Sequence, residues 1–434
     1  MKEKLIENFL RISSIPRMTG NEKEISNFFV EVAKKNNLEY YQDEDYNVLI
    51  KKKGNIEGTP IILQAHFDMV CVKTKDSKHD FNCEGIEVII EGDKLTAKDT
   101  SLGADQGVGL AMMLTIIEDN TISHPDLEFL FTVEEETTFK GVVDFDYDKL
   151  NGKELINLDN SSDDTVVIGA SGDIVNEYLY KLNLTEKDIP SYKVTLDGFK
   201  EGNSGENIEE SKDNAIVSMA RVLKDKDIYI KSITGGRFEN DLASSCEVII
   251  QTNLDINNIF NTNVKIESID NKSSLSLEES KDIVNEILSL ESGYLSDRSS
   301  ANLGIVETTN DLIRIVYLIR SDNLEELENI SNKTKELNYN FEFNNMYTDP
   351  IWNPDKDSEL LKKYNKAYFN LYNEYPKQII CQGSIESASI MNRVNNLDTI
   401  SIGANMNNIH SVNETTYISS WIKIYKVLLE LLKY

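Results

Sequence analysis

The chain of 434 residues is long enough for two or three domains, each with its own hydrophobic core. Its hydrophobic content of 40% and charged content of 27% are those of an ordinary soluble globular protein. The 74 acidic residues outnumber the 45 basic ones and give a net charge of −29. This charge argues against nucleic acid and anionic membranes as partners, because both are bound through basic patches.

The first segment, residues 1–11, has the spacing of a charged amphipathic helix and lacks the apolar centre of a secretory signal. No apolar run approaches the ~20 residues that span a bilayer. The four cysteines are widely spaced and form no paired motif, so we expect free thiols in a reducing compartment. These features predict a cytoplasmic protein without a membrane partner.

A polar loop leads into a helix expected over residues 21–35. Asn21 is in place to cap this helix, and Glu24, three residues on, occupies the capping-box position. Such a cap would satisfy amide groups that the first helical turn leaves without partners.

Short apolar runs between the helical segments have the composition of strands buried in a sheet. They are expected at residues 48–52, 60–65, 127–133, 155–158 and 399–403, with a hairpin at 87–97. Because these runs alternate with helical segments, including 108–118, 358–372 and 417–432, we predict an α/β domain whose mixed sheet is flanked by helices.

From about residue 191 the pattern changes to half-exposed strands and amphipathic helices. The expected strands are 192–196, 228–233, 246–252, 303–306, 312–319 and 339–343, and the expected helices are 214–224, 278–290 and 323–337. This order suits a separate α+β domain with an antiparallel sheet that helices cover on one face. We therefore predict one domain formed by residues 1–186 and 350–434, interrupted by an inserted α+β domain of residues 187–349.

A glycine-rich stretch, Leu102-Gly103-Ala104-Asp105-Gln106-Gly107-Val108-Gly109, stands at the centre of the pattern. It opens an apolar helix, and the partial positive charge of a helix start favours a carboxylate such as that of Asp105. Taken alone, the motif is equally typical of an aspartate that caps a buried helix.

Four further acidic or imidazole residues stand at the ends of apolar runs, where open α/β sheets place their ligand sites. They are His66, Glu136, Asp159 and His410, and with Asp105 they make five candidate ligands. Two imidazoles and three carboxylates, one of them shared, can hold two divalent ions about 3.5–4 Å apart. Nitrogen and oxygen ligands without thiolates favour zinc, with manganese or cobalt as alternatives.

Two neighbouring carboxylates have expected supporting roles. Asp68 follows His66 by two residues, which places it on the same side of an extended chain and lets it orient the ring. Glu135 and Glu136 are adjacent at a strand end and point in different directions. One can therefore bind metal while the other takes a proton from the attacking water.

Each motif also has an ordinary structural interpretation. A single His-x-Asp is often a surface pair, and a run of three glutamates such as residues 134–136 is usually a solvated face. His79 is expected in a loop, where it could line a pocket. The five ligand candidates carry weight because they occur together at strand ends.

The motifs occur over nearly the whole chain. They are Ile15-Pro16-Arg17, Gly20-Asn21-Glu22, His66-Phe67-Asp68-Met69-Val70, His79-Asp80-Phe81, Leu102-Gly103-Ala104-Asp105, Glu135-Glu136, Ile156-Asn157, Asp159, Asn302-Leu303-Gly304, Trp352-Asn353-Pro354-Asp355, Ile402-Gly403 and Ile409-His410-Ser411. In combination they resemble the aminoacyl-histidine dipeptidases (Xaa-His dipeptidases, or peptidase D), within the co-catalytic zinc exopeptidases.

The resemblance implies a catalytic domain interrupted by a lid domain, and it implies a division of the ligands between two zinc ions. His66 and Asp159 would hold one ion, and Glu136 and His410 would hold the other. Asp105 would bridge the two.

The resemblance also implies roles around the metals. Glu135 would be the general base and Asp68 would orient the histidine ligand. Glu386 falls where the family has a glutamate near the substrate, and His79 and Asn203 are further candidates for substrate contact.

The chain departs from the family in the lid. The family has Gly-Gly-His-Ser-Gly, whose histidine helps to stabilise the developing oxyanion, where this chain has Glu201-Gly202-Asn203-Ser204-Gly205. A second lid histidine is matched by Glu209, and a histidine shortly before Glu386 by Gln382. Asn203 can donate a hydrogen bond but cannot be cationic or shuttle a proton. We expect these departures to affect substrate range and turnover more than the metal site.

The sequence thus predicts a two-metal dipeptidase of the Xaa-His type or of broad specificity. We expect a dipeptide or another small amide as substrate and a homodimer as the assembly. One alternative is a related amidohydrolase that removes an acyl group from an amino acid. Another is a metal-bound, catalytically weak peptide-binding protein, which Asn203 and Glu209 suggest.

Overall fold

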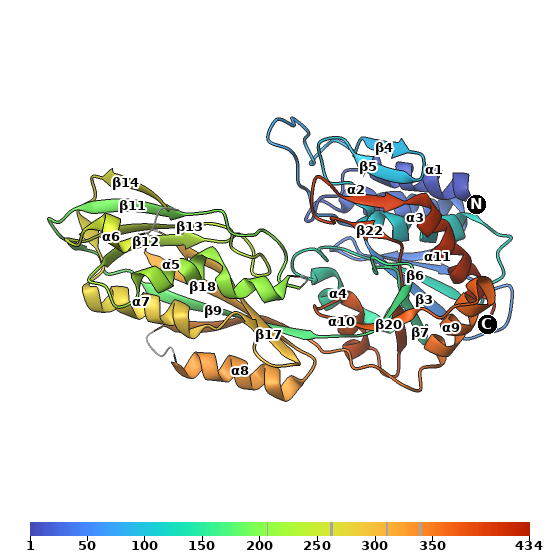
Figure 1. Ribbon diagram of the computed structural model, residues 1–434. Helices are drawn as coiled ribbons and strands as arrows, with labels where there is room; N and C mark the ends of the chain where they lie inside the picture. Colours follow the sequence, from blue (N-terminus) through green and yellow to red (C-terminus); the bar gives the residue numbers. More distant parts are fainter. Residues whose placement is uncertain (206, 261–263, 310, 338–340) are drawn as a thin grey trace. The chain divides into compact units, whose positions relative to one another are not determined.

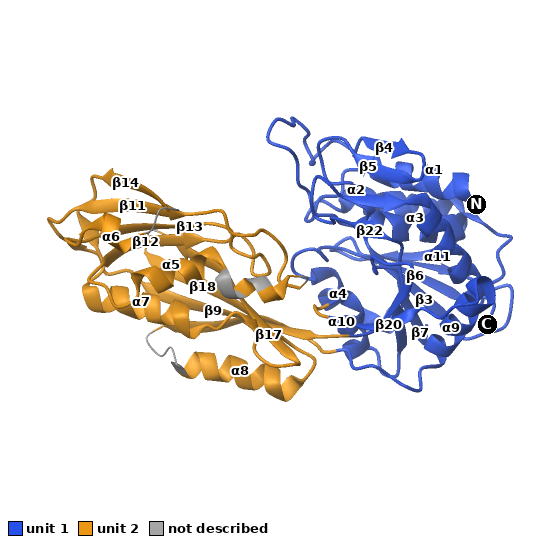
Figure 2. Cartoon of the chain, in the orientation of Figure 1, with its two compact units in different colours: residues 1–169, 352–381, 385–434 blue, residues 170–351, 382–384 orange. Residues whose placement is uncertain are grey.

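The computed structural model describes residues 1–205, 207–260, 264–309, 311–337 and 341–434. These residues divide into two compact units (Figure 2): unit 1 comprises residues 1–169, 352–381 and 385–434, and unit 2 comprises residues 170–351 and 382–384. The first change of unit falls at 169/170 instead of the expected 186/187. The reason is a strand that the sequence analysis did not single out, β9 (Gly172–Lys181), which pairs along its length with two strands of unit 2.

The described strands of unit 1 form an eight-stranded sheet. Its order is β1 (Glu39–Gln42), β2 (Val48–Lys52), β6 (Leu127–Thr132), β3 (Ile61–His66), β7 (Glu154–Asn157), β21 (Asp398–Ser401), β8 (Thr165–Ala170) and β20 (Lys377–Cys381). The central strands β6, β3, β7 and β21 are parallel, whereas β2 and β8 pair with them in the antiparallel sense. The sheet is therefore mixed, as expected.

Helices cover both faces of this sheet (Figure 1), which explains why β3 and β6 are buried at every position. One face packs against α1 (Lys2–Ser13), α2 (Lys23–Lys35), α3 (Ala104–Glu118), α9 (Glu359–Tyr372) and α11 (Ile418–Leu431). The other packs against α4 (Lys140–Asp144) and α10 (Glu386–Arg393). The predicted α/β domain with helices on its faces is confirmed.

A smaller sheet and one short helix complete unit 1. The sheet has the order β22 (Met406–Asn407), β23 (Thr415–Tyr417), β5 (Lys94–Ala97) and β4 (Val88–Glu91), and the 3-10 helix η1 spans Tyr147–Lys149. The expected hairpin over residues 87–97 is β4 and β5. The chain segment that follows His410 is held against this hairpin through β23.

The start of α2 differs from the expected cap. The helix begins at Lys23, so Asn21 lies outside it and no side chain caps it. Glu22 instead accepts hydrogen bonds from the amides of Gly20, at 2.8 Å, and Glu134, at 3.2 Å. The predicted capping box of Asn21 and Glu24 is wrong, because Glu22 occupies the position before the helix and no side chain caps its first turn.

The described strands of unit 2 form a nine-stranded antiparallel sheet. Its main order is β14 (Val264–Ile269), β11 (Ser191–Leu196), β13 (Cys246–Gln251), β12 (Tyr229–Gly235), β17 (Ser299–Thr308), β18 (Leu312–Ser321), β9 and β19 (Glu342–Asp349), with β16 (Gly293–Tyr294) beside β17. A short pair, β10 (Thr185–Glu186) and β15 (Ser273–Ser274), lies apart from it. The strand expected over 339–343 falls partly on residues 338–340, which lie outside the described residues.

Helices of unit 2 pack on one face of its sheet, as Figure 1 shows. They are α5 (Ala215–Leu223), α7 (Leu277–Ser289) and α8 (Leu324–Leu337), and shorter helices are α6 (Ile256–Ile259) and the 3-10 helix η2 (Ile208–Asp213). This arrangement confirms the expected α+β organisation. None of the helices in the described part of the chain combines the length and the apolar character that crossing a membrane requires.

Candidate metal centre

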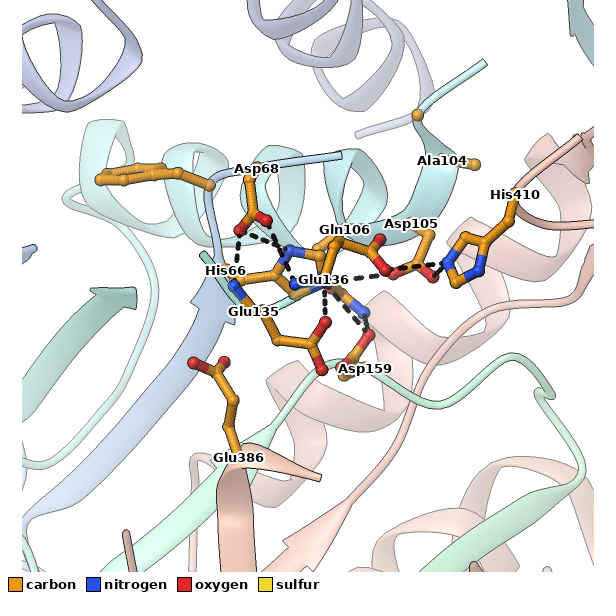
Figure 3. A network of polar contacts seen from close by, with 12 residues as sticks. His66, Asp68, Ala104, Asp105, Gln106, Glu135, Glu136, Asp159, Glu386 and His410 are labelled. Atoms are coloured by element: carbon orange, nitrogen blue, oxygen red, sulfur yellow. Dashed lines mark hydrogen bonds and ion pairs between the residues drawn. The ribbon is translucent and has the colours of Figure 1, made fainter. Parts of the chain in front are cut away.

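The C-terminal ends of the parallel strands bring the candidate ligands together (Figure 3). His66 is the last residue of β3, Glu135 and Glu136 lie in the turn after β6, and Asp159 follows β7. His410 lies in the loop between β22 and β23. Because parallel strands end at one edge of a sheet, residues far apart in the sequence reach the same site.

Asp105 lies at the centre of the cluster. Its Oδ1 is 3.3 Å from Nε2 of His66, and its Oδ2 is 3.4 Å from Nε2 of His410. The side chain of His66 is only 1% exposed, whereas that of His410 is 36% exposed. A carboxylate whose two oxygens face two different imidazoles has the geometry of a bridging ligand.

Glu135 and Glu136 point at different histidines, as expected for neighbours at a strand end. Glu136 Oε2 lies 3.0 Å from His410 Nε2, and Glu135 Oε2 lies 3.9 Å from His66 Nε2. Asp159 Oδ1 approaches the same nitrogen of His66, at 3.7 Å. The cluster therefore has a His66 side and a His410 side.

Two overlapping sets of atoms are close enough to share an ion. One set comes from His66, Glu135 and Asp159, and the other from His66, Asp105 and Glu136. Within each set the potential ligand atoms all lie within 4.8 Å of one another. The first set thus includes Glu135, whereas His410 belongs to neither set and lies against Glu136 and Asp105 at 3.0 and 3.4 Å.

Three carboxyl groups of the cluster, those of Glu135, Asp159 and Glu136, resist ionisation. Burial raises the pKa of Glu135 well above its usual range, although His66 opposes the shift. Burial also raises the pKa of Asp159 to about 7, and the charge of Asp105 adds to this rise. The pKa of Glu136 is raised by burial and by Asp105. These buried carboxyl groups therefore lie close together with only the two histidines nearby to balance their negative charge.

The histidines and Asp105 respond in the opposite sense. Burial alone would lower the pKa of His410, but Glu136 and Asp105 raise it to about 11. Burial would likewise raise the pKa of Asp105, but hydrogen bonds to His410 and His66 hold it below the usual range. The acidic surroundings thus favour positive charge at the centre of the cluster.

These observations fit divalent cations in this cluster. Four carboxylates and two imidazoles form an oxygen and nitrogen donor set without thiolates, which suits zinc, cobalt or manganese. Glu136 Oε1 is buried and lacks a hydrogen-bond partner among the described residues. An ion would satisfy this oxygen and allow the buried carboxyl groups to be ionised together.

Asp68 is fully buried behind His66 and contacts both sides of the site. Its Oδ1 lies 3.3 Å from His66 Nδ1. Its carboxylate accepts hydrogen bonds from the backbone amides of Glu135, at 3.1 Å, and Glu136, at 3.2 Å. Thr19 donates a further bond, at 2.9 Å. Asp68 therefore holds the turn that carries the two glutamates, and its role in orienting His66 stays a prediction.

The loop before Asp105 differs from the expected helix start. The φ/ψ angles of Asp105 and Gln106 are non-helical, the peptide bond between them is cis, and Gln106 Nε2 donates to Asp159 Oδ1. The amides of residues 102–105 are bonded to the carboxylate of Glu414. The carboxylate bound by these amides is therefore that of Glu414, and the carboxylate of Asp105 faces the two histidines.

Glu386 lies at the start of α10, and Figure 3 shows its carboxyl group directed toward the cluster. Its Oε2 accepts hydrogen bonds from Gln64 Nε2, at 2.6 Å, and Thr132 Oγ1, at 2.8 Å. Its Oε1 is buried without a partner in the described part of the chain. Burial raises the pKa of Glu386 to about 8. This oxygen is therefore suited to receive a hydrogen-bond donor from outside the protein.

His79 lies apart from the cluster, in the polar segment before β4. Its ring packs edge-on against Phe81, with centroids 4.6 Å apart, and its Nδ1 is 3.6 Å from Glu84 Oε2. In the residues that the structure describes, no hydrogen bond or ion pair joins His79 to the candidate ligands.

The remaining candidates belong to unit 2. Asn203 stands in a turn where its Oδ1 accepts the amide of Gly205, at 2.7 Å. Glu209 is exposed, and Gln382 is also exposed, in the short return segment of unit 2. The structure describes each unit by itself, so the roles of these residues stay predictions.

Sequence reasoning did not single out Gln64, Thr132 or Glu414. Gln64 and Thr132 are polar residues at fully buried positions of β3 and β6, two strands that are otherwise largely apolar. That contrast was a usable signal, because a buried polar group needs a partner. Glu414 has no comparable local signal, since its partners lie more than 300 residues away.

A family model described as "Peptidase family M20/M25/M40" matches residues 62–434. The cytosol non-specific dipeptidase of Escherichia coli is 27% identical over an alignment that covers 98% of this chain and 96% of the relative.

Solved structures show the same fold along the chain. The aminoacylhistidine dipeptidase of Vibrio alginolyticus is 25% identical with a TM-score of 0.75, and the match covers 99% of this chain and 96% of that one. A tripeptidase of Staphylococcus aureus is 16% identical with a TM-score of 0.64, covering 100% and 98%. The second match is a likeness of fold alone.

Proposed function

Because the chain belongs to peptidase family M20/M25/M40, we propose that it is a metallo-dipeptidase whose reaction takes place at the cluster around Asp105. The geometry of Asp105 carries this proposal, because its two oxygens face His66 and His410 at 3.3 and 3.4 Å. The Escherichia coli relative, a dipeptidase by name, is similar over nearly the whole chain. The Vibrio structure supports the same activity.

His66 and Asp159 would hold one divalent ion, and Glu136 and His410 would hold the other. Asp105 would contribute a ligand to both ions. Zinc is the proposed ion, with cobalt or manganese as alternatives. Two such ions act as Lewis acids that polarise the scissile carbonyl and lower the pKa of water.

Glu135 would serve as the general base and then as the general acid. Its carboxylate would take a proton from the attacking water and pass it to the nitrogen of the leaving amine. Its raised pKa suits this task, because a group that gives up and regains a proton readily works best near the operating pH. Its neighbour Glu136 faces His410 and is left as a ligand.

Asp68 would fix the tautomer of His66. With a proton on Nδ1 donated toward Asp68, at 3.3 Å, the lone pair of Nε2 is directed at the ligand cluster.

Glu386 would receive the free ammonium group of the dipeptide. Its buried Oε1 lacks a partner, while Gln64 and Thr132 hold its Oε2 in place. This carboxyl group favours a peptidase over an amidohydrolase that acts on N-acylated amino acids, since an acylated nitrogen carries no charge.

We also propose a cytoplasmic location and a homodimeric assembly. The location is supported by the four cysteines, none of which forms a disulfide bond in the structure.

A panel of small substrates tests the activity. The purified chain would be loaded with zinc, cobalt or manganese and assayed with Xaa-His dipeptides, other dipeptides, their N-acetyl derivatives and N-acetyl amino acids. We expect hydrolysis of dipeptides that have a free amine and little or none of the acetylated compounds. Preference for the acetylated compounds would support the amidohydrolase, and binding without turnover would support the peptide-binding alternative.

Asn203 is proposed to donate a hydrogen bond to the developing oxyanion, as the resemblance suggests for the matching lid histidine. Its Oδ1 is already bonded to Gly205, so Nδ2 is the group that would donate. We expect Asn203→Ala to reduce kcat by roughly 10²–10³-fold, the effect of losing one oxyanion donor, with unchanged metal content. Asn203→His is expected to retain or raise the rate.

Asn203→Asp is the matched control for the turn. It keeps an oxygen that can accept from Gly205 but has no side-chain N–H to donate. Rate loss in both the Ala and Asp variants supports the donor role. Full activity in the Asp variant would contradict it and leave Asn203 as a turn residue.

A further inference from the structure

Two buried charged residues behind the cluster, Arg17 and Glu414, touch no proposed ligand side chain among the described residues. We propose that they are positioning residues that fasten the Asp105 loop, residues 102–105, to the segments carrying His66 and His410. The inference rests on the proposed metal centre, and it concerns how that centre is assembled.

Glu414 joins the loop of Asp105 to the segment of His410. Its carboxylate is 3% exposed and accepts the amides of Leu102, at 2.8 Å, and Gly103, at 2.9 Å. Its other oxygen accepts the amide of Ala104, at 2.7 Å, and makes a longer bond, at 3.4 Å, to the next amide.

These bonds set the spacing of two proposed ligands. Glu414 follows His410 by four residues, and its own amide bonds to Ser411 within the same loop, at 3.2 Å. The buried carboxylate of Glu414 therefore accepts hydrogen bonds from four consecutive amides, the last of which is that of Asp105. It ties them to the loop whose histidine faces Asp105 Oδ2 at 3.4 Å.

Arg17 joins the same loop to the end of β3. Its guanidinium is 2% exposed and donates to the carbonyl oxygens of Phe67, at 2.9 Å, Asp68, at 2.7 Å, and Gly103. The first two carbonyls directly follow His66 in the chain. The planar fork of donors on an arginine suits such simultaneous bonds to separate carbonyls.

The loop is built to receive both groups. Gly103 has φ +68°, and a Cβ atom there would lie 2.5 Å from Arg17 Nη2 and 2.7 Å from Met69 Sδ. The peptide unit between Gly103 and Ala104 is therefore held at both ends: Glu414 accepts from its amide, and Arg17 donates to its carbonyl oxygen. Buried charges are costly without partners, and the bonds of Glu414 and of the two Nη atoms of Arg17 to this loop and its neighbours lower that cost.

Two isosteric or near-isosteric substitutions test the proposal, Glu414→Gln and Arg17→Met. Glutamine keeps the shape of the side chain but replaces one acceptor oxygen with a donor that opposes the amides. Methionine keeps much of the apolar stem of Arg17 and removes all three bonds to carbonyls.

Matched controls lie in the same unit, away from the cluster. Glu128 is 3% exposed and accepts hydrogen bonds from the amides of Asn151 and Gly152, both at 2.9 Å. Glu128→Gln therefore makes the first change elsewhere, and it also removes an ion pair with Lys51 at 3.0 Å. Lys52 is 5% exposed and donates to the carbonyls of Ile116 and Asp119, at 2.7 and 2.8 Å, so Lys52→Met repeats the second.

The measurement is the affinity of the metal-free protein for Zn²⁺, by competition with a chromophoric chelator, together with the rise in Tm on adding Zn²⁺. We expect Glu414→Gln and Arg17→Met to bind Zn²⁺ roughly 10–100-fold more weakly, as happens when groups that orient metal ligands are removed. Their zinc-induced rise in Tm should shrink accordingly. The controls should lower Tm equally with and without zinc and keep the wild-type affinity.

Wild-type zinc affinity in both test variants, or an equal loss in the controls, would overturn the proposal. Should Arg17→Met not fold, Arg17→Lys keeps the charge but reaches fewer carbonyls, and it is expected to show part of the same loss. No substrate enters these measurements. If the wild-type protein binds zinc but cleaves no dipeptide, only the proposed dipeptidase activity is contradicted. If it binds no zinc, the proposed activity and the positioning role of Arg17 and Glu414 are both contradicted.

Discussion

Replacement of Asp105 by alanine is expected to abolish hydrolysis and to reduce the bound metal toward none. Asp105 is the one candidate ligand whose carboxylate faces both histidines, with Oδ1 toward His66 and Oδ2 toward His410. Its removal leaves each proposed ion one oxygen short, and the remaining carboxylates repel one another with less positive charge between them. Elemental analysis of the purified variant, beside the dipeptide assay, measures both effects.

Asp159→Ala provides the comparison for this result. Asp159 lies on the His66 side only, with its Oδ1 3.7 Å from His66 Nε2, so its loss should release one ion preferentially and leave the other. An Asp105→Ala protein that kept two ions and full activity would remove the basis of the metal-centre assignment. Equal loss in the two variants would contradict the bridging role.

Replacement of Glu135 by glutamine is expected to lower kcat by roughly 10²–10⁴-fold, the range for losing a positioned general base. Both metals should remain, because the proposed ligands are untouched. Glu136→Gln should instead lose one ion preferentially, since its Oε2 lies 3.0 Å from His410 Nε2 on the other side of the cluster.

The two variants share the same backbone turn, held by Asp68 at 3.1 and 3.2 Å, so each controls for the other. Metal content and kcat are measured on both. If Glu135→Gln and Glu136→Gln lost metal equally, the division of roles between base and ligand would be wrong. In the structure Glu135 also lies within reach of His66 and Asp159, which makes this comparison a sharp one.

Local pattern in the sequence determined most of the secondary structure around the site. The runs 48–52 and 60–65 became β2 and β3, and the run 127–133 became β6, because a strand buried on both faces is apolar at successive positions. The acidic and imidazole residues at the ends of these runs followed from the same pattern. Parallel strands of an α/β sheet place such ends at a common edge, so a shared site could be expected from order alone.

Local pattern failed where a bond distant in sequence replaced a nearby one. Within the described residues 20–24, the expected Asn21 cap of α2 is missing because the helix begins two residues after Asn21, and Glu22 before it bonds the distant amide of Glu134. The first change of unit was expected at 186/187, where the sequence pattern changes, but it falls at 169/170 because β9 pairs with β18 and β19 of unit 2.

The sequence by itself determined which side chains could serve as ligands, since that depends on chemical type and on position relative to the strands. Only the tertiary structure decided how they are held. Glu414 and Arg17 reach the Asp105 loop from positions 310 and 86 residues away in the chain, at Ala104 and Gly103. Such bonds leave no periodic trace in the sequence, because their geometry is set by the packing of whole elements and not by the spacing of neighbouring residues.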